Sequence, residues 1–227
     1  MGVARGAENR QVTIDRLTRA ARVALGSGRP LDDRLIADIC EQNGVHPTAF
    51  RRFFATDDDL LDAVNEQLVL DCVSRLRSAV DAFEATDATA AGASEVAAPD
   101  PLGVAARMLA DSWPLDRGGL IIRSQRRLRA LTSPDGGGDA AAAAERSFVE
   151  RLVPVFEDLM RKLGRRFTWP PVLAVRVILD TYERSFESWL LMGHREEDFD
   201  GSPYAARTLP VLLRGTSEPA EPGPDAS

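Results

Sequence analysis

The chain of 227 residues is 44% hydrophobic and carries a formal net charge of -7. This length and composition suffice for one large domain, or for a small and a medium one, with a buried core. No apolar run reaches the roughly 18 to 20 residues of a membrane span, and the charged first ten residues lack the apolar stretch of a signal peptide. We therefore expect a cytoplasmic protein with no membrane partner.

The negative net charge argues against a nucleic-acid partner only while it is averaged over the whole chain. Residues 1–55 hold nine arginines against six acidic residues, a net charge of +3, which leaves -10 for the remainder. The positive charge is thus concentrated in the N-terminal segment, where arginines could bind the phosphates of a nucleic acid. Cys40 and Cys72 have no C-x-x-C partner and are interpreted as buried thiols, which fits a reducing compartment.

In chain order, residues 1–11 are expected to form a flexible arm, and apolar residues at helical spacing predict a first helix over residues 12–25. A second helix is predicted over residues 33–43. Gly44 suits a turn with positive φ, and Pro47 then opens a short helix, as its fixed φ and missing N–H allow.

A long helix is predicted to follow over residues 57–85. Thr56 and Asp59 have the spacing of a capping box at its start, and the helix is long enough to connect two domains. Residues 86–99 have the small, poorly patterned composition of a linker. Later helical patterns cover residues 101–113, 120–131, 139–166, 171–193 and 202–214, with a flexible loop at residues 133–138.

No segment alternates as a strand would, so the sequence predicts an all-α fold. We expect an N-terminal three-helix domain with a helix-turn-helix over residues 12–56, the connecting helix over 57–85, and a larger helical domain over 100–214 that binds a ligand and dimerises. The tail, residues 215–227, is rich in Pro, Glu and Gly and is predicted to be disordered.

A helix, a sharp turn, a short helix and a long support helix form the geometry that places a few side chains of the short helix in a DNA major groove. The stretch from Leu35 to Val64 resembles the DNA-binding signature of the TetR family of bacterial regulators, and the resemblance covers residues 12–70. The matching features are Asp38-Ile39, Gly44-Val45, Pro47, Phe50, Arg52, Phe54, Leu60-Leu61 and Ala63-Val64.

The resemblance implies a homodimer on a palindromic operator in double-stranded DNA, with repression relieved by a small-molecule effector in the C-terminal domain. It implies no cofactor, metal or catalytic residue. The chain departs from the family at Leu35, His46, Arg51, Phe53 and Asp57, where the family commonly has Thr, Ser, Tyr, His and Lys. Several of the usual residues hold phosphates, so the grip on the DNA backbone is expected to differ, and Asp57 is expected to repel it.

The candidate DNA contacts are the exposed polar residues around the short helix. Two adjacent arginines after this turn favour DNA, although they also fit an ordinary helix surface. A surface histidine in a turn is likewise an open alternative. The predicted DNA-binding residues are Arg34, His46, Pro47, Thr48, Arg51 and Arg52.

In the C-terminal half, aromatic residues and arginines are the candidates for a ligand pocket, although many of them also fit an ordinary core. These candidates are Trp113, Arg123, Arg127, Phe156, Tyr182, Phe186 and Trp189. The helix from Pro171 has a second, narrower apolar face that is predicted to pack on a partner subunit in a four-helix dimer bundle. The predicted dimer residues are Ile178, Thr181, Ser185, Ser188, Met192, Leu209 and Leu212.

Two other functions stay open at this point. One is a helical dimer that senses a ligand or a protein and binds DNA weakly or not at all. The other is a magnesium-dependent enzyme of the all-α isoprenoid type, because Asp58-Asp59-Leu60-Leu61-Asp62 has the D-D-x-x-D spacing. A second carboxylate cluster for further Mg²⁺ is missing from the sequence, and a helix start explains the same acids, so we interpret the chain as a non-enzyme.

Overall fold

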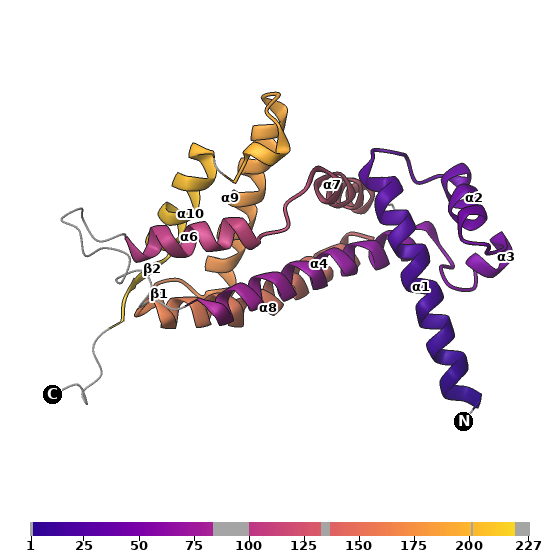
Figure 1. Ribbon diagram of the computed structural model, residues 1–227, viewed down its shortest axis with the longest axis horizontal. Coiled ribbons are helices and arrows are strands. Elements are labelled where there is room, and N and C mark those ends of the chain that lie inside the picture. The colour runs from indigo at the N-terminus through magenta and orange to yellow at the C-terminus, as the bar shows by residue number, and fades with distance from the viewer. Residues whose placement is uncertain (1, 84–99, 133–136, 201, 221–227) are drawn as a thin grey trace. The chain divides into compact units, whose positions relative to one another are not determined.

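The computed structural model describes residues 2–83, 100–132, 137–200 and 202–220. Apart from one short two-stranded ladder, the regular elements of these ranges are helical, so the all-α prediction is confirmed (Figure 1). The chain divides into two compact units, one made of residues up to 70 together with 116–141, the other of residues 71–115 together with those from 142 onward. The predicted linker, residues 86–99, falls outside the described residues. Over the described ranges, no helix has the length and apolarity needed to cross a membrane.

The first unit begins with α1 (Gly2–Gly26), followed by α2 (Asp33–Gln42), α3 (Pro47–Phe50) and the start of α4 (Asp57–Ala82). The prediction of a flexible arm over residues 1–11 is wrong from Gly2 onward, because α1 starts there. The segment contains no proline, and Arg10 ties it down by donating from Nη2 to the carbonyl oxygen of Arg52 at 3.2 Å.

Local side-chain caps fix the helix boundaries of this unit. Asp32 caps α2 by accepting the Leu35 N–H at 2.8 Å, and the chain turns beyond α2 at Gly44, whose φ of 63° confirms the predicted turn. At α4, Thr56 Oγ1 accepts the Asp59 N–H at 3.1 Å while Asp59 Oδ2 accepts the Thr56 N–H at 2.8 Å. The predicted capping box is therefore present.

A fifth element, α7 (Arg117–Thr132), completes the first unit by packing across α1 (Figure 1). Ile122 of α7 is fully buried in the same core as Leu17, Ile39 and Phe50. The two helices approach so closely that a Cβ built on Gly26 would lie 3.1 Å from the Cα of Gly118. The sequence prediction assigned this helix to a C-terminal domain over residues 100–214, whereas it belongs to the compact unit of α1 to α3.

The second unit contains the end of α4 and most of α8 (Gly137–Lys162). In this unit α10 (Pro203–Gly215) packs on both α6 (Pro101–Ser112) and α9 (Pro171–Leu191). Lys162, the last residue of α8, donates its three ammonium hydrogens to the carbonyl oxygens of Val80, Asp81 and Phe83 at 2.7, 3.0 and 2.9 Å. It thereby satisfies the orphan carbonyls at the C-terminal end of α4. The 3₁₀ helix η1 (Glu196–Asp198) lies between α9 and α10 in the sequence.

The ladder pairs β1 (Arg165–Phe167) with β2 (Ser217–Pro219) in antiparallel register, with Arg166 opposite Glu218. Arg165 fixes the pairing through Nε to Ser217 Oγ at 2.8 Å and Nη2 to the Ser217 carbonyl oxygen at 2.7 Å. The prediction of a disordered tail from residue 215 is therefore wrong up to residue 220, and residues 221–227 lie outside the described ranges.

Candidate functional site

The short helix α3 is anchored on one side and open on the other. Phe50 is fully buried and its ring centroid lies 5.2 Å from that of buried Phe54, whereas His46, Pro47 and Thr48 are exposed. His46 is the N-cap, and its Nδ1 accepts the Thr48 N–H at 3.2 Å. The buried rings of Phe50 and Phe54 thus anchor α3 on the core, while the first residues of this helix face solvent.

The exposed arginines around α3 fall into two groups. Within the described ranges, the side chains of Arg34 and Arg52 are exposed and make no hydrogen bond or ion pair. Arg51, in contrast, pairs with Asp57 at 2.9 Å and lies 3.8 Å from Asp33. Of the predicted DNA-binding arginines, Arg34 and Arg52 are therefore the two whose charge is available to a ligand.

The pairing of Arg51 with Asp57 involves two of the positions at which the sequence departs from the TetR pattern. The two substitutions are paired in space, since the basic group at position 51 neutralises the acidic group at position 57. The exposed Asp33 adds a second negative charge to the same guanidinium. This pairing reduces the expected repulsion between Asp57 and a polyanion, but the positive charge of Arg51 is then used within the protein and not for a phosphate contact.

Two arginines of α1 contact residues on either side of α3, and neither is among the residues predicted from the sequence. Arg10 lies over the Phe53 ring, with its guanidinium carbon 5.7 Å from the ring centroid, and Arg16 donates from Nη2 to the Asn43 carbonyl oxygen at 3.0 Å. No sequence pattern singles them out, because they are six residues apart on α1 and their contacts, Phe53 and Asn43, are distant in sequence.

The acids of the D-D-x-x-D stretch each have a structural partner. Asp59 belongs to the capping box, Asp58 pairs with Arg129 at 3.0 Å, and Asp62 pairs with Arg126 at 2.7 Å. Both arginines come from α7, and Arg126 is buried. In the described part of the chain, no group of three or more His, Cys, Asp or Glu side chains is placed to hold a metal ion. The stretch therefore acts as a helix start and as an attachment for α7.

Most of the predicted ligand residues form an aromatic core in the second unit. Trp113 packs on Tyr182 and Phe156, with ring centroids 5.0 and 6.2 Å apart, and Phe199 packs on Tyr182 and Phe186 at 5.5 and 5.0 Å. Trp189 joins the edge of this cluster, 6.2 Å from Phe199. The structure does not bring Arg123 and Arg127 into this core, because both lie on α7 in the first unit.

The hydroxyl of Tyr182 is buried in this cluster and has no hydrogen-bond partner among the described residues. Desolvation raises the pKa of Tyr182 well above its usual range, and the carboxylates of Asp200 and Asp111 raise it further. A buried hydroxyl without a partner lowers the stability of a fold.

Tyr182→Phe is therefore expected to stabilise the second unit by roughly 1 kcal/mol at neutral pH. Above pH ~10 the advantage should grow, because the tyrosine of the unfolded chain ionises there while the folded one stays protonated, so wild-type stability falls as pH rises. Urea denaturation followed by tryptophan fluorescence at pH 7 and pH 10.5 measures both effects. Loss of stability in the variant at pH 7 would show that the hydroxyl has a partner.

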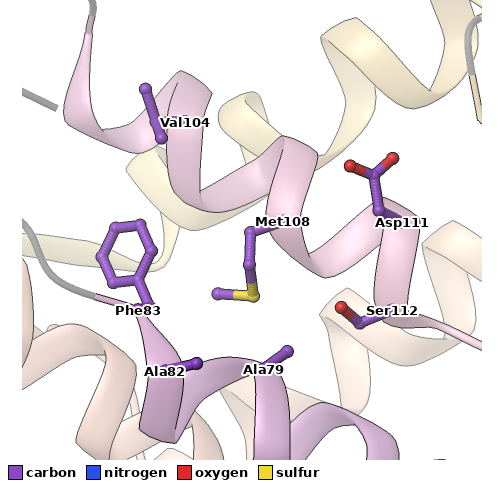
Figure 2. Close-up of a pocket in the computed structure, with 7 residues that line it drawn as sticks. All are labelled: Ala79, Ala82, Phe83, Val104, Met108, Asp111 and Ser112. Carbon is purple, nitrogen blue, oxygen red and sulfur yellow. The ribbon is translucent and has the colours of Figure 1, made fainter. Parts of the chain in front are cut away.

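An open pocket of about 450 Å³ lies in the second unit between the end of α4 and α6 (Figure 2). None of the predicted ligand residues lines it, so sequence reasoning missed this site. Only the matching helical patterns of α4 and α6 could have pointed to it. Its lining residues are Ala79, Ala82, Phe83, Val104, Met108, Asp111 and Ser112.

The predicted dimer residues divide into two sets. Ile178 and Leu209 are fully buried inside the second unit, so assigning them to a subunit interface is wrong; helical spacing alone does not distinguish the two faces of α9. Thr181, Ser185, Ser188 and Leu212 are partly exposed, and Met192 is 52% exposed. Leu191 and Val211, which were not predicted, are more exposed still at 81% and 67%.

The first unit thus has the three-helix arrangement of a helix-turn-helix, joined to a larger helical unit. Over 91% of its length the chain superposes, with a TM-score of 0.60 and 15% sequence identity, on 97% of a protein from Mesorhizobium loti that is assigned to the TetR family of transcriptional regulators. The chain therefore shares the fold of that regulator, as the sequence resemblance implied. No family model and no curated protein matches the sequence.

Proposed function

We propose that the chain is a transcriptional regulator that binds a palindromic DNA operator as a homodimer and is released by a small-molecule effector. The observation that carries the proposal is the short helix α3, anchored by buried Phe50 with His46 and Thr48 exposed and with Arg34 and Arg52 uncommitted nearby. In the helix-turn-helix geometry these groups enter the major groove or reach its flanking phosphates. The likeness of fold to a TetR-family regulator supports the same function.

Selection of bound duplexes from a random pool by the purified chain tests the proposal. We expect enrichment of a palindromic sequence whose half-sites are about one helical turn or somewhat more apart. Affinity for the selected duplex should fall steeply with salt concentration, because phosphate contacts release counterions. Failure to enrich any sequence, with duplex affinity no better than micromolar at low salt, would contradict the proposal.

A dimer is supported by the large apolar side chains that α9, its C-cap and α10 leave exposed, which are Leu191, Met192 and Val211, and by the partly exposed small residues Ser185 and Ser188 of α9. A helix face of small side chains allows close packing of a second copy. Sedimentation equilibrium of the wild type and of Val211→Arg measures the dimer directly. We expect the charged substitution to shift the chain toward monomer, with Arg176→Gln, an exposed change elsewhere on α9, as the control.

Effector control is supported by the way the chain connects the two units. Only residues 113–116 separate α6, which lines the pocket, from α7, which packs on α1, and α4 continues from one unit into the other. Through its ion pairs with Asp58 and Asp62, α7 is attached to the first turns of α4. A ligand that displaces α6 therefore acts on the DNA-binding unit, with a coupling of about 1 to 3 kcal/mol if it is typical.

A second candidate function is a sensing dimer with weak DNA binding, and the neutralisation of Arg51 by Asp57 and Asp33 favours it. Asp57→Asn separates the two candidates, because it removes the nearer of the two acids that neutralise Arg51 while keeping the shape of the side chain at the start of α4. For a DNA-binding protein we expect the variant to bind duplex DNA about three- to tenfold more tightly at low salt, with a steeper salt dependence.

Fluorescence anisotropy of a labelled duplex over a range of salt concentrations measures both quantities. Glu157→Gln, which removes an exposed acid of the second unit, is the matched control and should leave affinity within twofold of the wild type. If Asp57→Asn instead weakens binding, Asp57 holds Arg51 in the position from which it contacts DNA.

A further inference from the structure

The pocket between α4 and α6 has an apolar wall and a polar end. One side of the pocket is formed by Ala79 and Ala82 of α4 and by Phe83, which directly follows this helix. The other side is formed by Val104 and Met108 of α6 (Figure 2). Asp111 and Ser112 lie at the end of the pocket farthest from Phe83 and Val104. A volume of about 450 Å³ accepts a small organic molecule.

The polar end of the pocket has a negative charge without a balancing base. Asp111 makes no ion pair with any described residue, and none of the lining residues is lysine or arginine. Desolvation raises the pKa of Asp200, and the nearby Asp111 carboxylate raises it further, so the two acids repel each other. A cation near Asp111 would relieve this repulsion, whereas an anion would add to it.

Buried Tyr182 does not line the pocket, but the Asp111 carboxylate at the polar end of the pocket acts on it. Its hydroxyl is close enough to both carboxylates for them to act on its ionisation, and it lacks a hydrogen-bond partner in the described ranges. Its ring lies against those of Trp113 and Phe199, which offer electron-rich faces. These rings belong to the core and do not line the pocket, so the negative charge of Asp111, with Asp200 close enough to repel it, is what favours a cation there.

We infer that this pocket binds an organic cation with an apolar body, in which a quaternary or protonated amine lies at the Asp111 end and the hydrocarbon part packs on Phe83, Val104 and Met108. The inference rests on the ligand part of the proposed function and names the chemical class of the effector. A neutral apolar ligand would cover Asp111 without compensating its charge. An organic carboxylate or sulfonate would meet repulsion from Asp111 and Asp200.

Isothermal titration calorimetry of the full chain, in the absence of DNA, tests the inference with three probes whose alkyl chains have six or seven carbons. These are hexyltrimethylammonium, the neutral 1-heptanol and the anionic hexanesulfonate. We expect the cation to bind at least tenfold more tightly than either other probe, with an affinity that falls as salt is added. Equal binding of the three probes, or no binding of the cation up to 10 mM, would overturn the inference.

Two variants place the binding in this pocket. Asp111→Asn should weaken the cation about fivefold and leave 1-heptanol unchanged, as expected for a charge at the rim of a pocket. Val104→Trp, which fills the apolar end, should abolish binding of the cation, whereas Glu157→Gln should change nothing. Unchanged cation affinity in Asp111→Asn, or in a folded Val104→Trp, would overturn the assignment of the site.

The same titrations keep this inference distinct from the proposed function. A chain that enriches a palindromic duplex but binds no cation would retain the regulator function and lose the ligand assignment. A chain that binds the cation through Asp111 but binds no duplex would retain the ligand site and lose the DNA-binding function. Addition of hexyltrimethylammonium to the protein–DNA complex then measures the coupling between the two.

Discussion

The double substitution Arg34→Gln with Arg52→Gln is expected to weaken binding to the selected duplex by about tenfold to a hundredfold, and to reduce the slope of log affinity against log salt by about 2. The reason is that both side chains are exposed beside α3 and have no partner in the described part of the chain. Neither arginine supports the fold, so the thermal unfolding of the variant should match the wild type. Anisotropy titrations from 50 to 300 mM salt measure affinity and slope together.

The matched control removes the same amount of positive charge from the second unit. Arg107 on α6 and Arg146 on α8 are exposed and likewise unpaired over the described residues. Arg107→Gln with Arg146→Gln should leave affinity within about twofold and the salt slope nearly unchanged, since only phosphate contacts enter the slope. Equal losses in the two double variants would mean that net charge, and not the surface around α3, controls binding to DNA.

Phe50→Ala is expected to destabilise the first unit by about 3 to 5 kcal/mol and to abolish DNA binding. Phe50 is fully buried in the core that also holds Leu17, Ile39 and Phe54. All three tryptophans, Trp113, Trp169 and Trp189, belong to the second unit. Unfolding of the first unit should therefore appear in far-UV circular dichroism before any change in tryptophan fluorescence.

Urea titrations followed by both signals measure this separation. Phe53→Ala is the matched control, because Phe53 lies just beyond Arg51 and Arg52, which follow α3, but is only half-buried, and we expect a cost of about 1 kcal/mol. A Phe50→Ala variant that unfolds at the wild-type urea concentration by both signals would contradict the role of Phe50 as the anchor of α3.

The parts of the fold that the sequence predicts well depend on short-range chemistry. The capping box of Thr56 and Asp59, the positive φ of Gly44 and the start of α3 at Pro47 each involve residues within a few positions of one another. The burial of Phe50 follows from helical spacing once the turn is placed. These features locate α3, and with it most of the candidate DNA-binding residues.

The features that the sequence does not predict arise from contacts between distant residues. Ser217 pairs with Phe167 across 50 positions, and a three-residue ladder leaves no alternation to detect. The assignment of α7 to the first unit depends on Ile122 reaching the α1 core, which no local pattern encodes. The partners of Arg51 are invisible for the same kind of reason, because Asp33 precedes it by more than a whole helix.

The function of the second unit is the least predictable part, since its candidates were chosen by residue type alone. Aromatic side chains fill cores as readily as they line pockets, and here Phe156, Tyr182 and Phe186 are core. The pocket is instead lined mostly by small and aliphatic side chains of α4 and α6, together with the aromatic Phe83 and the polar Asp111 and Ser112. The charge of Asp111 indicates a ligand class only once the structure shows that, among the described residues, no lysine or arginine pairs with Asp111.

The cap that Lys162 places on α4 has a consequence for covalent labelling. This lysine is the only one in the sequence, and its amine is engaged by three carbonyl oxygens. An amine-acylating reagent therefore has one lysine side chain to modify. It can react there only when the hydrogen bonds between the amine and the C-terminal end of α4 are transiently broken. The rate of acylation at Lys162 therefore reports how often the C-terminal end of α4 opens. Mass spectrometry measures this rate without any engineered probe.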